Sequence, residues 1–141
     1  MTVKISVSDD KEYWQIARAI TKFNLDHLPE NSSNNMCSLG YVAKDPHAGL
    51  VGGVYGKLIL GNCLSVDVLW VDPAHRERDY GTILMEAIEN GARSLGSRLS
   101  IVDTFEFQAL NFYEKNGYQQ FGVLDDCPCP GNKRFYLKKV L

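Results

Sequence analysis

The sequence predicts a mixed α/β fold, with a mixed, mostly antiparallel sheet and helices on both of its faces. Two observations predict this fold class. Several short segments alternate apolar and polar residues with period two, whereas others repeat apolar residues at helical spacing. In the second half of the chain a strand, a helix and a strand follow one another, which predicts a right-handed crossover between two parallel strands. The strands before this unit follow one another directly, so we expect antiparallel neighbours there.

The first expected elements are a strand over residues 2–7 and a helix. Residues 2–7 alternate and are rich in β-branched side chains. Ser8 or Asp9 can cap the helix, and Pro29 ends it. Residues 30–36 are small and polar and predict a loop. The helix itself is predicted from apolar residues at helical spacing, namely Tyr13, Ile16, Ala17, Ile20 and Phe23.

Three strands are expected next, over residues 37–45, 50–60 and 63–71. The middle segment contains three glycines, which is typical of bulges or of close backbone approach. Residues 46–49 and the Gly-Asn pair at 61–62 predict the turns between them.

The second half of the chain brings in the crossover unit. An apolar stripe over residues 83–95 predicts a helix that Gly96 closes. The elements expected after it are a strand over 98–103, a helix over 107–118 that ends at Gly117, and a hairpin of 119–124 with 133–140.

Composition and length set the broad class of the protein. The chain has 141 residues, of which 45% are apolar and 23% charged, which suits a single soluble domain over residues 1–141. No window approaches 18 apolar residues and the start has no apolar signal region, so we expect a cytoplasmic protein without a membrane span. A net charge of -2 with mixed signs argues against nucleic acid as the main partner.

The cysteines do not follow the spacing of a metal site. A zinc site needs C-x-x-C pairs or histidine partners at set distances along the chain. Here one residue separates the close cysteine pair, and the three histidines are scattered. We therefore expect no metal, and we expect reduced thiols at Cys37, Cys63, Cys127 and Cys129.

A charged loop precedes the central helix in the stretch VDPAHRERDYGTILMEAIENGA, residues 71–92. The start of a helix leaves backbone N–H groups unpaired and carries partial positive charge, so a diphosphate fits there. This loop has one glycine, Gly81, behind the run RERD. It is an anion site, or it is a solvated turn in which Asp79 caps the helix and occupies the donors that a phosphate needs.

Two segments resemble a known family. Residues 69–92, LWVDPAHRERDYGTILMEAIENGA, resemble the acetyl-CoA-binding motif V-x-P-x-x-[RQ]-x-x-G-x-[GA] of the GNAT N-acetyltransferase superfamily. Residues 103–122, DTFEFQALNFYEKNGYQQFG, resemble its later segment A-x-x-F-Y-x-K-x-G-[FY], and further phrases resemble a subgroup of short bacterial members. The order of elements also matches. The resemblance covers nearly the whole chain and implies a GNAT fold with a β-α-β acetyl-CoA-binding core.

The resemblance also implies a set of residues that bind the coenzyme. The backbones of Leu69 and Val71 would pair with the pantetheine arm, and one of their N–H groups would serve as the oxyanion donor. Ala109 and Phe112 belong to the same set. The backbone of the loop would cradle the pyrophosphate through Arg76, Glu77, Arg78, Asp79, Tyr80, Gly81 and Thr82.

One residue of the loop departs from the family pattern. Asp79 stands where the motif has its earlier glycine. A carboxylate repels a pyrophosphate, and an aspartate adopts positive φ less easily than glycine does. The positive charges of Arg76 and Arg78 could offset the negative charge of the Asp79 carboxylate.

Three residues are candidates for the chemistry. By resemblance, Tyr113 sits near the thioester sulfur. A phenol pKa near ~10 and a thiol pKa near ~8.5 leave both a hydrogen bond and a proton transfer open.

Asp67 interrupts an apolar strand, on the face of Ser65 and Leu69 by period two. It is a base for the amine or a site for a cationic substrate, or else a solvent-facing residue.

Glu106 is the third candidate. It stands where many family members carry asparagine, and it would share a face with Ala109 and Tyr113 if the helix starts early enough. Glu106 is a second candidate base, or only a charge at the start of a helix.

Further residues receive expectations of their own. We interpret Trp70 as packing, on the side opposite to Leu69 and Val71, and we expect an exposed His75. Lys115 either reaches the adenosine end of the coenzyme or is a solvated charge on the helix. Three residues are candidates for the acceptor pocket, namely Asp103, Thr104 and Gln108.

The function implied by the resemblance is an acetyl-CoA-dependent N-acetyltransferase that acts on a primary amine of a small molecule or a peptide. The alternatives are a CoA-binding module without catalysis and an unrelated nucleotide-binding or interaction domain. The chain lacks G-x-x-x-x-G-K-[ST], which argues against a P-loop. The sequence leaves the oligomeric state open between a monomer and a homodimer, in which the final strands would form the interface.

Overall fold

The structure is a computed structural model that describes residues 2–30, 36–60 and 62–141. Backbone contacts divide the chain into two compact units, Met1–Asn34 and Asn35–Leu141. A single domain over the whole chain stays a prediction. Most of the expected loop at 30–36 and the first residue of the expected turn at 61–62 lie outside the described residues.

The first unit contains helix α1 (Asp10–Asp26). Asp9 caps it, because the Asp9 carboxylate accepts from the backbone N–H of Glu12 at 2.8 Å and the Glu12 carboxylate accepts from Asp9 at 3.0 Å. Residues 2–7 form no strand, so that expectation is wrong. Alternation indicates a backbone suited to a strand, but a strand also needs a partner for its hydrogen bonds, and the described residues of this unit contain no second strand.

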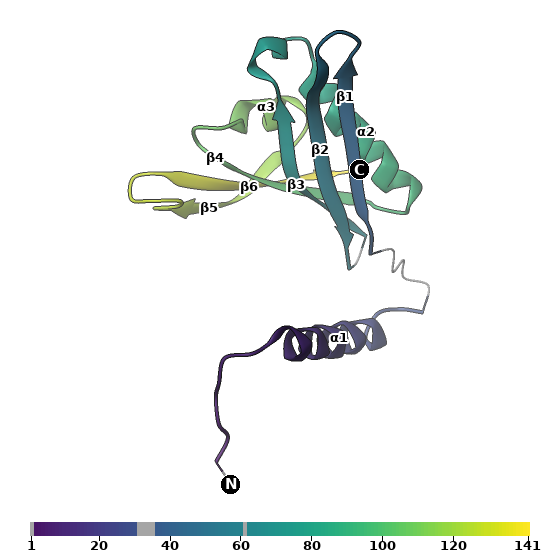
Figure 1. The fold of residues 1–141 in the computed structure, drawn as a ribbon, viewed down its shortest axis with the longest axis vertical. Helices are drawn as coiled ribbons and strands as arrows, with labels where there is room; N and C mark the ends of the chain where they lie inside the picture. Colours follow the sequence, from purple (N-terminus) through teal and green to yellow (C-terminus); the bar gives the residue numbers. More distant parts are fainter. Residues whose placement is uncertain (1, 31–35, 61) are drawn as a thin grey trace. The chain divides into compact units, whose positions relative to one another are not determined.

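The second unit is built on a six-stranded sheet in the order β1-β2-β3-β4-β6-β5 (Figure 1). Strands β3 and β4 pair in parallel, whereas the other neighbouring pairs are antiparallel. The predicted mixed, mostly antiparallel sheet is therefore confirmed. Its strands are β1 (Ser38–Asp45), β2 (Gly49–Ile59), β3 (Cys63–Val71), β4 (Leu99–Phe105), β5 (Gln119–Asp125) and β6 (Lys133–Val140).

Strands β3 and β4 pair over a short distance and then separate. Their parallel register joins Cys63, Leu64 and Ser65 to residues 99–101. Beyond this pairing the two strands diverge, as Figure 1 shows. The last six residues of β3 therefore have no strand partner on the β4 side, and their backbone on that side is available to a ligand.

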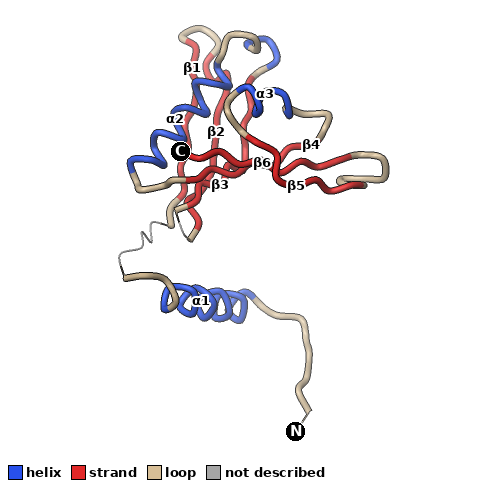
Figure 2. Tube along the Cα trace, turned by 180° about the vertical axis from the view of Figure 1, so that it is seen from behind, coloured by secondary structure: helices blue, strands red, loops and turns tan. Residues whose placement is uncertain are grey.

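Two helices of this unit pack on one face of the sheet, α2 (Tyr80–Ser94) and the short α3 (Leu110–Lys115). Seen from behind in Figure 2, both lie in front of the strands. The core joins four residues of α2 to side chains of β2, β3, β4 and β6, and the α2 residues are Leu84, Met85, Ile88 and Ala92. Each is at most 3% exposed, so α2 is fixed along its length by apolar burial.

A glycine sets the distance between α2 and α3. A Cβ atom added to Gly81 would lie 3.0 Å from the ring of Phe112. A glycine at the start of α2 therefore lets the first turn of this helix approach α3 closely. The short 3-10 helix η1 (Pro73–His75) connects β3 to this region of the chain.

Candidate active site

A cavity of about 820 Å³ opens where β3 and β4 separate. Its wall combines the end of β3, the loop before α2 and the start of α3. Of the residues predicted to bind the coenzyme, Arg78 does not line it and all the others do. The complete lining is Leu69, Trp70, Val71, Arg76, Glu77, Asp79, Tyr80, Gly81, Thr82, Phe107, Gln108, Ala109, Phe112, Lys115 and Asn116.

Two of these lining residues, Phe107 and Asn116, were not expected from the sequence. Phe107 follows β4, and its ring stacks on Phe105 with centroids 5.4 Å apart. Asn116 is the C-terminal cap of α3, where its side-chain amide donates to the carbonyl of Phe112 at 2.8 Å. Phe107 belongs to the phrase TFxFQAxxFYEKxGY, which resembles short bacterial members of the family, whereas Asn116 stands at an unspecified position; the resemblance gave neither residue a role in binding.

The start of α2 presents unpaired backbone donors to this cavity. Asp79 is the N-cap residue, but its side chain makes no capping hydrogen bond. The first helical bond runs from the N–H of Ile83 to the carbonyl of Asp79 at 2.9 Å. Within the described residues, the N–H groups of Tyr80, Gly81 and Thr82 have no hydrogen-bond partner. The alternative in which Asp79 occupies these donors is therefore wrong.

The loop before α2 reaches this shape through strained residues. Glu77 and Asp79 adopt left-handed backbone conformations, with φ of 64° and 60°. An aspartate tolerates this region better than most residues, and a glutamate less well. Nε of Arg76 donates to the carbonyl of Val71 at 3.0 Å and so ties the loop to the end of β3. Arg76 thus supports the loop as well as lining the cavity.

Tyr113 lies behind the cavity wall, on α3. It is 7% exposed and belongs to the core, and its ring meets those of Phe112 and Tyr118 edge-on at centroid distances of 5.2 and 5.7 Å. Burial, with a smaller contribution from the charge of Asp103, raises the pKa of Tyr113 to about 12. Among the described residues its phenol makes no hydrogen bond. At neutral pH it is a neutral donor without a partner.

Asp67 shares a face of β3 with Ser65, as expected, but not with Leu69. A register shift between Tyr55 and Gly56 pairs these residues with Val68 and Val66, which leaves Asp67 as the extra residue of a bulge. Leu69 consequently packs against the core, whereas the Asp67 side chain is 44% exposed.

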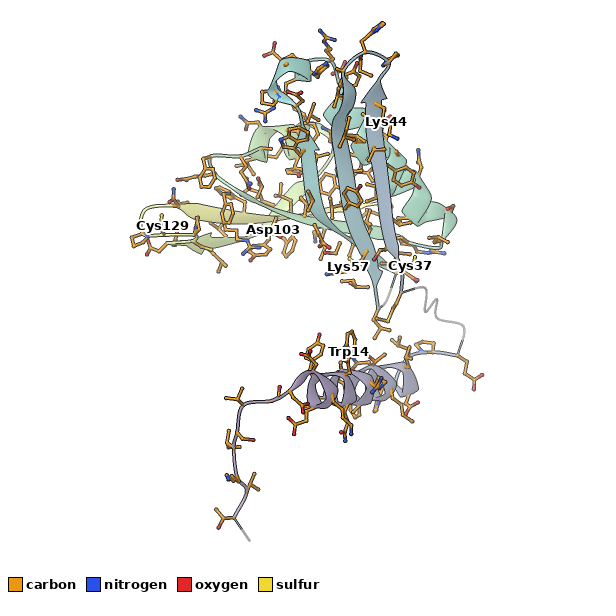
Figure 3. All side chains as sticks on the ribbon, viewed as in Figure 1. Trp14, Cys37, Lys44, Lys57, Asp103 and Cys129 are labelled. Atoms are coloured by element: carbon orange, nitrogen blue, oxygen red, sulfur yellow. The ribbon has the colours of Figure 1, made fainter. Side chains whose placement is uncertain are left out.

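The partners of Asp67 come from its own strand and from β2. Ser65 donates to its carboxylate at 3.2 Å, and Nζ of Lys57, near the end of β2 in Figure 3, lies 3.5 Å from it. Asp67 is thus a half-exposed carboxylate, placed on β3 beyond the point where the two parallel strands part.

Glu106 lies outside α3, so the early helix start that would align it with Tyr113 does not occur. It is exposed in the turn after β4, and its backbone N–H donates to the carbonyl of Lys133 at 3.1 Å. Because α3 begins at Leu110, Glu106 shares no helical face with Tyr113. The condition for the shared face is therefore not met, and none of the three catalytic candidates, Tyr113, Asp67 and Glu106, lines the cavity.

The other expected residues differ in their surroundings. Trp70 is 47% exposed and lines the cavity, so it is not a packing residue. The His75 side chain is 16% exposed, with Nδ1 3.5 Å from the Asp72 carboxylate, so His75 is not exposed as expected. Asp103 lies on β4 beside β6 (Figure 3), where it accepts from Nε of Arg134 at 2.8 Å.

The part of the chain that the structure describes contains neither a metal-binding cluster nor a membrane-spanning helix. Within residues 2–30, 36–60 and 62–141, no three histidine, cysteine or acidic side chains are grouped as a metal site would need. The four cysteines are free. None of the helices that the structure describes combines the length and apolar composition needed to cross a bilayer.

Comparison with known proteins places the chain in a family. The family described as Acetyltransferase (GNAT) domain matches residues 38–120, more than half of the chain. The blasticidin-S acetyltransferase of Streptomyces morookaense is 38% identical over 93 residues, which are 65% of this chain and 67% of that protein.

Solved structures agree with this match. A crystal structure of an acetyltransferase from Bacillus cereus ATCC 14579 has a TM-score of 0.89 and 32% identity, covering 99% of this chain and 98% of that one. An aminoglycoside 6'-N-acetyltransferase complexed with coenzyme A shares the fold at a TM-score of 0.66 and 18% identity, over 98% and 95% of the two chains. The chain therefore belongs to the GNAT acetyltransferases and is an acyltransferase.

Proposed function

We propose that this acyltransferase moves the acetyl group of acetyl-CoA to a primary amine of a small molecule by direct attack on the thioester. The observation that carries the proposal is the set of unpaired N–H groups at the start of α2, which faces a cavity at the separation of β3 and β4. Such donors suit a pyrophosphate, because the helix terminus adds partial positive charge.

The coenzyme would enter this cavity in an extended form. Its pyrophosphate would lie on the N–H groups of Tyr80, Gly81 and Thr82. The pantetheine arm would run along the unpaired edge of β3, where Leu69 and Val71 line the cavity. A backbone N–H of this edge would also donate to the thioester oxygen as negative charge develops on it.

In the reaction, the amine nitrogen bonds to the thioester carbonyl carbon and the bond from that carbon to sulfur breaks. The departing sulfur gains the electron pair, and the amine loses one proton. The Tyr113 phenol, with a pKa raised to about 12, is a much weaker acid than a thiol, whose pKa is near ~8.5. Tyr113 would therefore donate a hydrogen bond to the sulfur without giving up its proton.

Asp67 is the proposed base, acting through water. It is half-exposed on β3 just beyond the paired segment, whereas Glu106 lies in the turn after β4; neither carboxylate lines the cavity itself. We therefore favour Asp67 over Glu106.

The proposed acceptor class is an antibiotic with a primary amine. The similarity to a blasticidin-S acetyltransferase supports this class. Release of the CoA thiol would be followed with acetyl-CoA and a panel of blasticidin S, a streptothricin, an aminoglycoside, a polyamine and a short peptide. The same amines with their nitrogen already acetylated are the matched controls.

We expect thiol release with at least one free amine and none with its acetylated control. A protein that binds CoA but turns over no amine of the panel would favour the alternative, a CoA-binding module. A protein that binds no CoA at all would overturn the proposal.

A further inference from the structure

The side chain of Gln108 folds back onto the turn between β4 and α3. Its Oε1 accepts from the backbone N–H of Phe105 at 2.8 Å and lies 3.3 Å from Oγ1 of Thr104. Thr104 is 2% exposed, and its hydroxyl in turn accepts from the N–H of Ala109 at 3.3 Å. The Gln108 carboxamide is thus held at one end by a fixed network.

This network determines which way the carboxamide points. A backbone N–H can only donate, so the Gln108 atom 2.8 Å from the nitrogen of Phe105 is the oxygen. The Nε2 amino group is therefore the opposite end. In the part of the chain that the structure describes, Nε2 makes no hydrogen bond.

Gln108 also lines the cavity. The wall combines apolar side chains with the side-chain acceptors of Glu77, Asp79 and Asn116, and Nε2 bonds to none of these acceptors. Gln108 is exposed, so its oriented Nε2 is accessible at the cavity wall. Such a donor suits a ligand that brings a carbonyl oxygen, because a carbonyl that loses water on binding needs a donor.

We propose that Nε2 of Gln108 donates to an amide carbonyl of the pantetheine arm and so positions the arm between β3 and α3. This inference rests on the proposed function, since it takes acetyl-CoA as the ligand. The arm carries two amides that lose water on entering the cavity. The unpaired edge of β3 serves one side of the arm, and Gln108 supplies a donor from the facing side.

The test uses Gln108→Glu in the full-length protein. The new carboxylate still accepts from Phe105 and Thr104, but it has no N–H to offer and adds a negative charge near a carbonyl. We expect the Kd for CoA to rise about ten-fold or more. The nucleotide half of CoA, adenosine 5'-diphosphate 3'-phosphate, lacks the arm. Its Kd for Gln108→Glu should stay within about two-fold of its Kd for the natural protein, apart from any effect of the added charge that acts equally on CoA.

Isothermal titration of both probes against both proteins separates the outcomes. If the natural protein binds CoA and Gln108→Glu binds it equally tightly, the inference about Gln108 fails and the proposed function stands. If the natural protein binds no CoA, the proposed function itself fails. An equal weakening of both probes would show an effect on charge or fold and would overturn the contact with the arm.

A second measurement does not depend on the variant's folding. In the natural protein labelled with 15N-glutamine, the side-chain NH₂ signals of the glutamines are recorded with each probe. One NH₂ pair should shift with CoA and stay unchanged with the nucleotide half. The absence of any shift that is specific to CoA would contradict the proposal.

Discussion

The hydroxyl of Tyr118 donates to Oε1 of Glu89 at 3.0 Å, which links the end of the segment between α3 and β5 to the middle of α2. Glu89 is 2% exposed, and its other oxygen accepts from Nζ of Lys139 at 2.8 Å. The Tyr118 ring packs edge-on against Tyr113. The buried carboxylate thus fixes the two helices that form the cavity wall and supports the ring of the proposed catalytic tyrosine.

Replacing Glu89 by glutamine tests this support. The change leaves Lys139 without its carboxylate in a largely buried position, so we expect the free energy of unfolding to fall by about 2 to 3 kcal/mol. Urea unfolding measures it. The exposed pair of Asp125 with Lys133 is the control, and Asp125→Asn should cost less than about 0.5 kcal/mol. Equal losses in the two variants would contradict the role of Glu89.

Replacing Asp79 by glycine tests the departure from the family motif. Asp79 has a φ of 60° and no capping hydrogen bond, so glycine relieves strain without removing a contact. We expect a gain in stability of about 1 kcal/mol and a several-fold lower Kd for CoA.

Asp79→Asn separates the two effects, because asparagine removes the charge and keeps a side chain that tolerates the left-handed region. It should tighten CoA binding with little change in stability. A Kd that is unchanged or higher in both variants, measured by titration calorimetry, would show that the carboxylate does not oppose the pyrophosphate.

Replacing Tyr113 by phenylalanine tests the proposed donor. We expect kcat to fall about 10- to 100-fold while the Kd for acetyl-CoA stays the same, because the lost hydrogen bond forms with the departing sulfur. Steady-state turnover measures kcat, and titration calorimetry measures the Kd for acetyl-CoA. A higher Kd with unchanged kcat would assign Tyr113 to coenzyme binding instead.

The pH dependence of stability follows from the same residue. The pKa of Tyr113 is about 12 in the folded chain, above the ordinary value near 10 for an unfolded one. Its contribution to stability is therefore complete below about pH 10 and is lost as the pH rises toward 12. Absorbance titration should show one tyrosinate, absent in Tyr113→Phe, that forms near pH 12. Its formation near pH 10 would contradict the burial argument.

Replacing Asp67 by asparagine tests the proposed base. We expect kcat/KM to fall about 100-fold near neutral pH and to recover partly at higher pH, where the amine is already neutral. Glu106→Gln is the matched control and should stay near the natural rate, since Glu106 lies in the turn after β4 and not on the unpaired segment of β3 that carries Asp67. If the control falls and Asp67→Asn does not, the two assignments are reversed.

Periodicity and motif spacing together predicted most of the second unit. The strands from β1 to β6 and helices α2 and α3 form where alternation or helical spacing indicated them. The expected strand at 2–7 does not form, because a pattern shows that a segment can be a strand and says nothing of its partner. The bulge at Asp67 likewise shifts the phase of β3, which a strict period of two does not foresee.

The site was predictable to the extent that it follows a motif. The loop residues from Arg76 to Thr82 were expected to bind the coenzyme, and all of them except Arg78 line the cavity. The fixed orientation of Gln108 depends on side-chain hydrogen bonds within one turn, which no spacing rule reveals. Phe107 and Asn116 reach the cavity through the path of the chain around α3.

The most direct measurement is a crystal structure of the protein with CoA bound. We expect the pyrophosphate oxygens at about 3 Å from the backbone nitrogens of Tyr80, Gly81 and Thr82, with the sulfur beside the Tyr113 phenol. Coenzyme bound elsewhere, or a pyrophosphate out of reach of these amides, would contradict the proposed site and the mechanism built on it.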